Sequence, residues 1–342
     1  MNQEINIPQF SPNLSESSEF STETLQWIAD RNLWNLWVPK AYKGLESSLT
    51  EGLKTLQALA KTDGSLGWTV TLCSGANYFI GNLQPETANH IFLNTKKTVC
   101  FGGSGGVFGT AEKQGDDYII SGEWRYATGA PYLSHFTLNT KIMSDGKPIL
   151  NDDGMPLVYS FFVPKEDVTI IEDWDTMGLK ATATHSFKVD AVVVSSKQAF
   201  VYNNFYLPQP IFKIPFMVFA DLTLWVNYLG MAEHFLQEAA KILELEILEP
   251  FALLLSKTNQ RLYTFAERVE LLTTSDTTIT EAYTKTIHKT ASASVKEMSQ
   301  AILNIYPLLG VKACSQQHPL NRIFRDYFTA TQHHIFSRRQ CF

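Results

Sequence analysis

The chain has 342 residues, of which 44% are hydrophobic, 12% are aromatic and only 18% are charged. This composition excludes intrinsic disorder, which requires low hydrophobicity and high charge, and the length suggests two or three domains of roughly 150 residues. The formal net charge of −6, without a cluster of lysines and arginines, argues against nucleic acid or an anionic membrane as a partner.

Four cysteines are scattered along the sequence: Cys73, Cys100, Cys314 and Cys341. They lack a C-x-x-C motif and histidines at metal-ligand spacing, so we expect reduced thiols, no metal site and a cytoplasmic location. Residues 1–21 are polar and acidic, which predicts no signal peptide. The longest apolar stretch, residues 211–236, is broken by charged residues and a proline, which predicts a buried helix and no membrane span.

Hydrophobic periodicity divides the chain into three zones. Apolar residues recur every three to four positions from Thr22 to about Asn94, which predicts helices. From about Lys97 to Phe200, short β-branched and aromatic runs alternate with turn sequences, which predicts an antiparallel sheet or barrel. Helical periodicity returns from Ile211 to the end.

These zones predict an α+β protein without a βαβ nucleotide fold. The expected domains are an N-terminal helical domain over 1–96, a middle β-domain over 97–205 and a C-terminal helical bundle over 206–342. The sequence Gly102-Gly-Ser-Gly-Gly looks like a phosphate loop, but it lacks the lysine of G-x-x-x-x-G-K-[ST] and the G-x-G-x-x-G spacing. A flexible connection between strands explains it at least as well.

Three stretches, in order, carry a family resemblance. The first is Trp37-Val-Pro-Lys-Ala-Tyr-Lys-Gly with Asp63-Gly-Ser-Leu-Gly-Trp, and the second is Gly109-Thr-Ala-Glu-Lys with Trp124-Arg-Tyr-Ala-Thr-Gly. The third is Trp174-Asp-Thr-Met-Gly-Leu-Lys with Arg322-Ile-Phe-Arg-Asp. Together they resemble the acyl-CoA dehydrogenase superfamily, and within it most closely the flavin-dependent monooxygenase branch, whose oxygenase components accept reduced flavin from a partner reductase.

The resemblance implies a fold and a chemistry. The implied fold has an N-terminal helical domain, a middle antiparallel β-domain and a C-terminal four-helix bundle. The implied function is an oxygenase component that uses reduced flavin (FMN or FAD) and O₂ on a small organic substrate. A flavin reductase partner and a homodimer or homotetramer are implied as well.

The resemblance also points to flavin-binding residues. Tyr126 and Ala127 would touch the flavin ring, and the hydroxyl or amide of Thr128 would hydrogen-bond near its N5 atom. Ser104 and Gly105 could offer further donors to flavin or substrate, because small residues permit close approach. Without the resemblance, the Tyr126–Thr128 segment would be interpreted as a strand with core aromatic residues and a Thr-Gly turn.

A second group of candidates follows Asp326. Arg325 is a candidate cofactor contact, although an Arg-Asp pair on a helix more often fixes packing. In acyl-CoA dehydrogenases the base that removes the α-proton is commonly a glutamate at the position of His334. The oxygenase branch tends to carry a histidine at the position of His333, to hydrogen-bond an oxygenated flavin or to deprotonate the substrate. A neutral imidazole suits either role near pH 7, and a partly exposed helix end is the alternative interpretation.

Three departures from the family pattern keep other functions open. Cys73 and Ser74 stand about where relatives place a second histidine, whose role could shift to Asn77 or Tyr78. The segment Gly178-Leu-Lys-Ala-Thr-Ala-Thr replaces a Gly-Thr-Gly-Ser-like turn. The segment that grips the flavin diphosphate in dehydrogenases is missing, which suits FMN or loosely held reduced flavin. The alternatives are an acyl-CoA dehydrogenase with an altered base and a non-catalytic family member.

Overall fold

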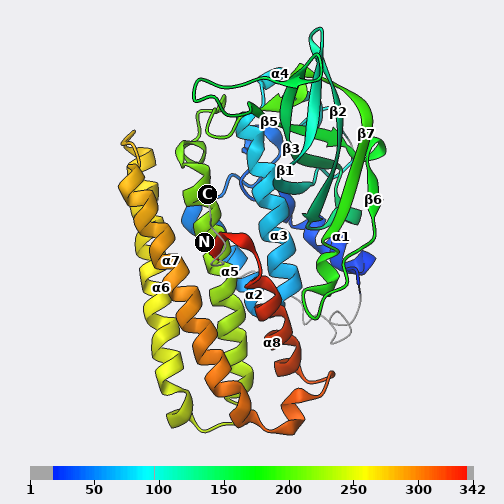
Figure 1. Cartoon of the computed structure of the whole chain (residues 1–342). Helices are drawn as coiled ribbons and strands as arrows, with labels where there is room; N and C mark the ends of the chain where they lie inside the picture. The colour runs from blue at the N-terminus through cyan, green and yellow to red at the C-terminus, as the bar shows by residue number, and fades with distance from the viewer. Residues whose placement is uncertain (1–17, 96, 337–342) are drawn as a thin grey trace.

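The computed structural model describes residues 18–95 and 97–336, whose elements follow the predicted order of helices, strands and helices (Figure 1). The N-terminal helices are α1 (Thr22–Asp30), α2 (Leu49–Thr62), α3 (Gly64–Asn77) and α4 (Pro85–Phe92). The strands are β1 (Phe101–Gln114), β2 (Asp117–Ala127), β3 (His135–Ser144), β4 (Lys147–Pro148), β5 (Val158–Pro164), β6 (Thr169–Ile171), β7 (His185–Ser195) and β8 (Ala199–Phe200). The C-terminal helices are α5 (Phe216–Ala239), α6 (Leu245–Thr274), α7 (Glu281–Ile305) and α8 (Pro319–Ala330).

This order confirms the predicted α+β class, whereas the domain boundaries after residues 96 and 205 stay predictions. Of residues 1–21, for which no signal peptide is predicted, the structure describes 18–21, and Cys341 lies outside the described residues. Among the helices described, none is long and apolar enough to cross a membrane.

Within the described residues the strands form one eight-stranded sheet in the order β6-β7-β2-β1-β3-β5-β8, with β4 paired to β3. The prediction of a wholly antiparallel sheet is wrong for one of these strand pairs, because β1 and β3 run parallel. The chain reverses between β1 and β2 and again before β3, and β3 then pairs with the free edge of β1 opposite β2. Two reversals restore the direction of β1, so the pairing between β1 and β3 is parallel.

The glycine-rich segment at residues 102–109 belongs to strand β1, so the prediction of a strand connection there is wrong. Two of its glycines allow close approach. A Cβ atom on Gly103 would lie 1.8 Å from the Thr137 carbonyl oxygen, and one on Gly109 would lie 2.2 Å from the Trp124 ring. The pairing of β1 with β3 shifts register between Gly103 and Val107, so the strand is locally irregular.

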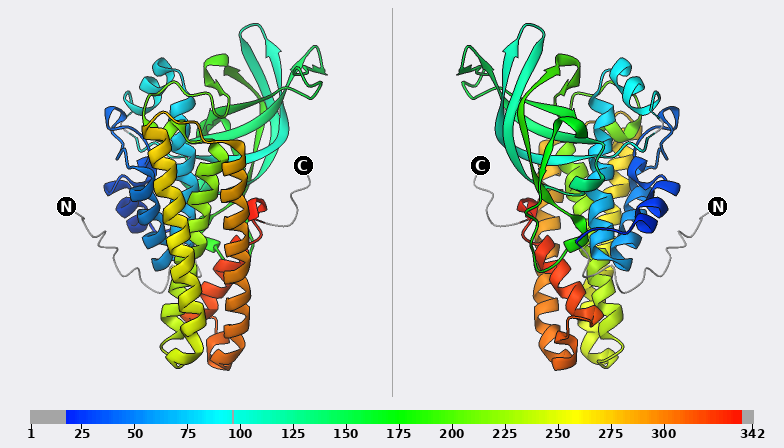
Figure 2. Two further views of the ribbon diagram at one scale, coloured as in Figure 1. Left: turned by 90° about the vertical axis from the view of Figure 1, so that its left-hand side faces the viewer. Right: turned by 90° about the vertical axis from the view of Figure 1, so that its right-hand side faces the viewer.

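The helices pack into a bundle that supports the sheet at one end (Figure 2). Helix α3 lies between this bundle and the sheet, because it contacts both α5 and β1. Asp63 caps the start of α3 by accepting a hydrogen bond from the Leu66 amide at 2.9 Å. Glycines set the spacing of α2, α3 and α5, since Cβ atoms on Gly67 and Gly230 would lie 2.6 and 2.8 Å from the Ala60 Cβ atom, and the one on Gly67 only 2.4 Å from the Ala60 Cα atom. Helix α3 is thus held close to two partners at once.

A buried histidine in the sheet gives a pH prediction. Burial against Phe101 and Phe162 lowers the pKa of His135 to about 4. Unfolded histidine titrates near its ordinary value, so the unfolded chain binds the extra proton as the pH falls from about 6.5 to about 4. We therefore expect the wild type to lose up to about 1 kcal/mol more stability per pH unit in this window than His135→Gln.

Urea unfolding of both proteins at pH 8, 6 and 5 measures this difference. Acidic groups shared by the two proteins, such as Asp326, cancel in the comparison. At pH 8 the two differ by packing and by the hydrogen bond between Ser134 Oγ and His135 Nδ1, which lie 2.9 Å apart. Parallel stability profiles between pH 8 and 5 would contradict the assignment of a neutral buried His135.

Candidate functional site

The backbone bends sharply where β2 ends. Tyr126 has a φ of 67°, which is uncommon for a residue other than glycine, and the register between β2 and β7 breaks between Trp124 and Ala127. As a result the Tyr126 side chain is 67% exposed, whereas Ala127 and Thr128 are buried. The Tyr126 ring meets Trp174 edge-on at 6.4 Å. A residue with a strained backbone and an exposed aromatic ring suggests a functional role, because such strain persists only where the surrounding structure imposes it.

The Thr128 hydroxyl is the end of a chain of hydrogen bonds. The Thr184 hydroxyl donates to Thr128 Oγ1 at 3.2 Å, and the hydroxyls of Thr184 and Thr182 lie 2.7 Å apart. The Thr182 hydroxyl in turn donates to the Leu179 carbonyl at 2.7 Å. The hydroxyls of Thr182 and Thr184 carry two protons for these three contacts, so not all three bonds form at once. When Thr184 donates to Thr128, the Thr128 hydroxyl keeps its own proton for another acceptor.

The loop that carries these threonines is anchored on α8. Asp326 accepts a hydrogen bond from the Leu179 amide at 2.6 Å, and the Cβ position of Gly178 lies 2.3 Å from the Arg325 carbonyl group. Arg325 donates to the Met177 carbonyl at 2.7 Å. Burial and the nearby carboxylate of Asp63 raise the pKa of Asp326 to about 7. Arg325 thus holds the loop in place, and its predicted contact with a cofactor stays a prediction.

Helix α3 packs against the turn that follows Thr128. The Cys73 thiol lies 3.6 Å from the Thr128 carbonyl oxygen, and a Cβ atom on Gly129 would lie 3.0 Å from the Cys73 sulfur. The same Cβ position is 3.5 Å from the Thr69 methyl group. Thr69 Oγ1 is fully buried and has no hydrogen-bond partner within the described part of the chain. The atom of Thr69 nearest to Gly129 is thus its methyl carbon, while the hydroxyl is a buried polar group without a partner among the described residues.

The same turn of α3 also carries Trp68, which contacts the predicted histidine. The Trp68 ring meets the rings of His333 at 5.6 Å and Tyr228 at 6.0 Å, both edge-on. Burial, together with the neighbouring His334, lowers the pKa of His333 to about 3, so its imidazole is neutral at pH 7. His333 Nδ1 accepts a hydrogen bond from the Ile335 amide at 3.4 Å, which leaves the ring proton on Nε2. His333 is therefore a donor through Nε2.

His334 differs from its neighbour in exposure. It is exposed to solvent, its ring lies 4.5 Å from that of His333, and partial burial lowers its pKa. Of the two predicted histidines, His333 is the half-buried one, and it contacts α3 through Trp68.

Ser104 and Gly105 lie in the irregular part of β1. Ser104 Oγ accepts a hydrogen bond from the Gly106 amide at 3.4 Å, and the Gly105 carbonyl accepts one from Asn139 at 2.8 Å. Their strand passes close to Thr128, because a Cβ atom on Gly102 would lie 3.1 Å from the Thr128 carbonyl oxygen. A contact of Ser104 or Gly105 with a cofactor stays a prediction.

Asn77 and Tyr78, the suggested substitutes for a second histidine, have structural partners. The Asn77 amide donates to the Val99 carbonyl at 3.0 Å and its oxygen accepts from the Phe101 amide at 2.7 Å. The Tyr78 hydroxyl donates to the carbonyls of Ile211 and Ile214, both at 3.1 Å. Sequence reasoning also missed Trp68, Thr69 and Thr184, although all three stand in or beside the motifs that carry the resemblance.

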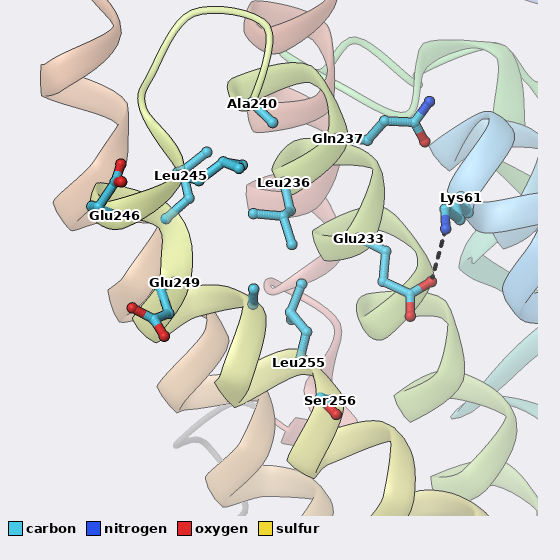
Figure 3. A pocket seen from close by; sticks show the side chains of 12 residues that line it. Lys61, Glu233, Leu236, Gln237, Ala240, Leu245, Glu246, Glu249, Leu255 and Ser256 are labelled. Carbon is cyan, nitrogen blue, oxygen red and sulfur yellow. Dashed lines mark ion pairs between the residues drawn. The ribbon is translucent and has the colours of Figure 1, made fainter.

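A cavity of about 820 Å³ lies elsewhere, between the end of α2, the second half of α5 and the start of α6 (Figure 3). Leucines from α5 and α6 line it, and Lys61 pairs with Glu233 at its edge at 3.9 Å. The predicted site residues are not among those that line it. In the part of the chain that the structure describes, no three His, Cys, Asp or Glu side chains are grouped to hold a metal ion.

Comparisons with known proteins show which protein family this chain resembles. Residues 256–338 match the family model described as "Acyl-CoA dehydrogenase, C-terminal domain". The indole-3-acetate monooxygenase of Acinetobacter baumannii is 28% identical over 226 residues, which cover 65% of this chain and 55% of that protein. The match thus spans about half the length of this curated relative.

Solved structures agree in fold over nearly the whole chain. XiaF from Streptomyces sp., in complex with FADH2 and glycerol, has a TM-score of 0.85 at 17% identity, covering 95% of this chain and 87% of XiaF. The HsaA monooxygenase from M. tuberculosis has a TM-score of 0.84 at 17% identity, covering 94% and 89% respectively. The chain therefore has the acyl-CoA dehydrogenase fold. Its predicted resemblance to that superfamily, and within it to the flavin-dependent monooxygenase branch, is confirmed.

Proposed function

We propose that this protein is the oxygenase component of a flavin-dependent monooxygenase. In the overall reaction, reduced flavin and O₂ convert a small organic substrate into its hydroxylated product, with oxidised flavin and water as the other products. The curated relative named above is a monooxygenase, and the XiaF structure contains FADH2, which supports this class of chemistry.

One observation in the structure carries the proposal. A single turn of α3 contacts both predicted halves of the site, because Trp68 packs on His333 while Thr69 lies beside Gly129, next to Thr128. Thr128 and His333 come from elements 205 positions apart in the sequence (333 − 128). Two candidate donors next to one turn of a buried helix suit a bound flavin and its oxygen chemistry.

The residues present fit a flavin. Thr128 has its hydroxyl proton available when Thr184 donates to it, Thr69 has a buried hydroxyl without a partner among the described residues, and Tyr126 offers an exposed ring. We propose that Thr128 donates to the flavin ring near N5, with Thr69 as a second polar contact and Tyr126 against the ring. When bound, reduced flavin supplies the electrons that activate O₂. The missing diphosphate segment favours FMN or loosely held reduced flavin.

His333 acts as a hydrogen-bond donor in this proposal. A group with a pKa of about 3 is a poor base near neutral pH, which argues against deprotonation of the substrate by His333. Its Nε2–H can instead donate to an oxygen atom of the reacting group, and the Trp68 ring packs edge-on against the imidazole.

Flavin binding and product formation test the proposal together. Purified protein is titrated with FMN, FAD and anaerobically reduced flavin, and is then supplied with reduced flavin, O₂ and a panel of small aromatic compounds. We expect tighter binding of reduced than of oxidised flavin and a hydroxylated product detected by mass spectrometry. Reduction of bound flavin by an acyl-CoA without O₂ would support the alternative dehydrogenase. Failure to bind any flavin would favour the non-catalytic alternative.

Thr128→Val is expected to weaken flavin binding about tenfold, because one hydrogen bond to the flavin is lost while the side-chain volume is kept. Thr140→Val is the matched control, since Thr140 is a fully buried threonine in β3 whose hydroxyl lacks a partner among the described residues. Equilibrium dialysis gives both dissociation constants. Equal affinity in the two variants would remove Thr128 from the flavin site.

The remaining expectations belong to the same proposal. A separate flavin reductase would supply reduced flavin, and the chain would assemble into a homodimer or homotetramer in the cytoplasm. The three predicted domains, 1–96, 97–205 and 206–342, would place the flavin where the β-domain meets the helices. Analytical ultracentrifugation of the purified protein tests the oligomeric state.

A further inference from the structure

Asp326 on α8 is a buried carboxylate that contacts two other parts of the candidate site. Its Oδ1 atom accepts a hydrogen bond at 2.6 Å from the Leu179 amide, in the loop over residues 177–184. The first residue of α3 packs against the same side chain, because a Cβ atom on Gly64 would lie 3.0 Å from the Asp326 Cβ atom and 3.2 Å from Oδ2. The Asp326 side chain therefore lies where α8, α3 and the loop meet.

The backbone of this loop has a conformation that needs support. Leu179 has a φ of 53° and Ala183 has a φ of 42°, both in the left-handed region that residues other than glycine seldom adopt. Such conformations persist where surrounding contacts impose them. The Leu179 amide donates to Asp326, and the Leu179 carbonyl accepts from the Trp174 indole at 3.0 Å. Asp326 thus supplies one of the hydrogen bonds that hold Leu179 in this conformation.

The loop in turn holds the turn that follows Thr128. The Gly129 amide donates to the Thr182 carbonyl at 2.8 Å, and the Thr184 hydroxyl lies 3.2 Å from Thr128 Oγ1. Thr182 is tied back to Leu179, whose carbonyl accepts from the Thr182 amide at 3.2 Å. A shift of Leu179 therefore moves Thr182 and, through it, the backbone next to Thr128.

Helix α3 is the second support of this turn. The Cys73 thiol lies 3.6 Å from the Thr128 carbonyl oxygen, and Cys73 stands nine residues after Gly64 on the same helix (73 − 64). A regular helix moves as one body over this length, since its backbone hydrogen bonds fix the rise per residue. Both supports of the turn, the loop and α3, thus contact Asp326.

Building on the proposed function, we propose that Asp326 is a positioning residue for Thr128, the donor to the flavin. Asp326 acts through Leu179 and the loop, and it does not itself contact flavin or substrate. Arg325 assists from the preceding position, because it donates to the Met177 carbonyl at 2.7 Å in the same loop. The two residues of the Arg-Asp pair therefore hold the loop at two points.

A double-mutant cycle with flavin binding as the readout tests this role. Equilibrium dialysis gives the dissociation constants of the wild type, Asp326→Ala, Thr128→Val and the double variant, with whichever of FMN and FAD the wild type binds more tightly. We expect each single variant to bind about tenfold more weakly, and the double variant also only about tenfold, since Asp326 acts through Thr128. Additive losses, about 100-fold in the double variant, would overturn the proposal.

Hydrogen–deuterium exchange of the protein without flavin locates the effect. Asp326→Ala is expected to speed exchange in the peptides that contain the Leu179 and Gly129 amides, because their hydrogen bonds weaken together. Asp326→Asn is the conservative variant. Its carboxamide oxygen still accepts from the Leu179 amide, so flavin affinity should return to within about threefold of the wild type. Unchanged exchange in Asp326→Ala, or no recovery of affinity in Asp326→Asn, would contradict the positioning role.

Asp221→Ala controls for the loss of a buried carboxylate as such. Asp221 is a fully buried aspartate on α5 whose Oδ1 atom lies 2.9 Å from His288 Nδ1. This variant should leave flavin affinity and the exchange of both peptides unchanged, and losses equal to those of Asp326→Ala would count against the proposal. If Asp326→Ala does not fold, Gly178→Ala takes its place in the cycle. A Cβ atom there would lie 2.3 Å from the Arg325 carbonyl group, so the loop must move away from α8.

The outcomes separate this inference from the proposed function. Flavin binding with additive losses in the cycle would overturn the inference alone. A Thr128→Val protein that binds flavin as tightly as the wild type would remove Thr128 from the flavin site and the positioning role with it. A wild type that binds no flavin would contradict the proposed function itself.

Discussion

Replacing Gly67 by alanine is expected to lower the free energy of unfolding by about 3 kcal/mol, the upper range for overpacking a core position. A Cβ atom at this position would lie 2.4 Å from the Ala60 Cα atom and 2.6 Å from its nitrogen. These are backbone atoms of α2, so no side-chain rotation relieves the clash. Helix α3 must move away from α2, and the contacts of Trp68 and Thr69 move with it.

Gly75→Ala in the same helix is the matched control. The nearest atom to a Cβ on Gly75 is Phe219 Cε1 at 3.8 Å, which is ordinary van der Waals contact. Alanine loses less backbone entropy than glycine in a helix, so this variant is expected to gain about 0.5 to 1 kcal/mol. Urea or thermal unfolding monitored by circular dichroism measures the free energy of unfolding of both variants. A Gly67→Ala protein as stable as Gly75→Ala would show that the α2–α3 contact is looser than described.

The helices and most strands could be predicted because their hydrophobic patterns are local. Strand β1 could not, since its glycines are present for close approach to Thr137 and Trp124, which lie far away in the sequence. The parallel pairing of β1 with β3 could not be predicted from the sequence either, because it depends on which edge of the sheet β3 joins. A sequence pattern does not encode that choice.

The candidate site was predictable only where a family motif includes its residues. Thr128 and His333 follow from the resemblance, and the structure brings both to α3. Thr184 and the proposed role of Asp326 were missed because they depend on partners in other elements, namely the Thr128 hydroxyl and the Leu179 amide. The role of a buried polar side chain of this kind can be inferred only once its hydrogen-bond partners in the folded protein are known.

The proposed oxygenase chemistry makes the role of His333 testable. His333→Leu removes the Nε2–H donor but keeps an apolar side chain of moderate size against Trp68, so the fold should persist. Loss of a positioned proton donor typically costs about 100-fold or more in rate. We expect His333→Leu to lower the rate of product formation by about 100-fold, with the consumed O₂ appearing as hydrogen peroxide. Flavin affinity should change little, because Thr128 and Thr69 are untouched.

Two variants control for structure at this position. His333→Asn offers an amide N–H in place of the ring N–H and should recover part of the product yield. His334→Leu changes the solvent-exposed neighbour and should stay within a fewfold of the wild type. Product and peroxide are measured together with the same supply of reduced flavin. A His334→Leu protein that loses product as severely as His333→Leu would mean that the pair acts through packing, since only the His333 ring packs against Trp68 of α3.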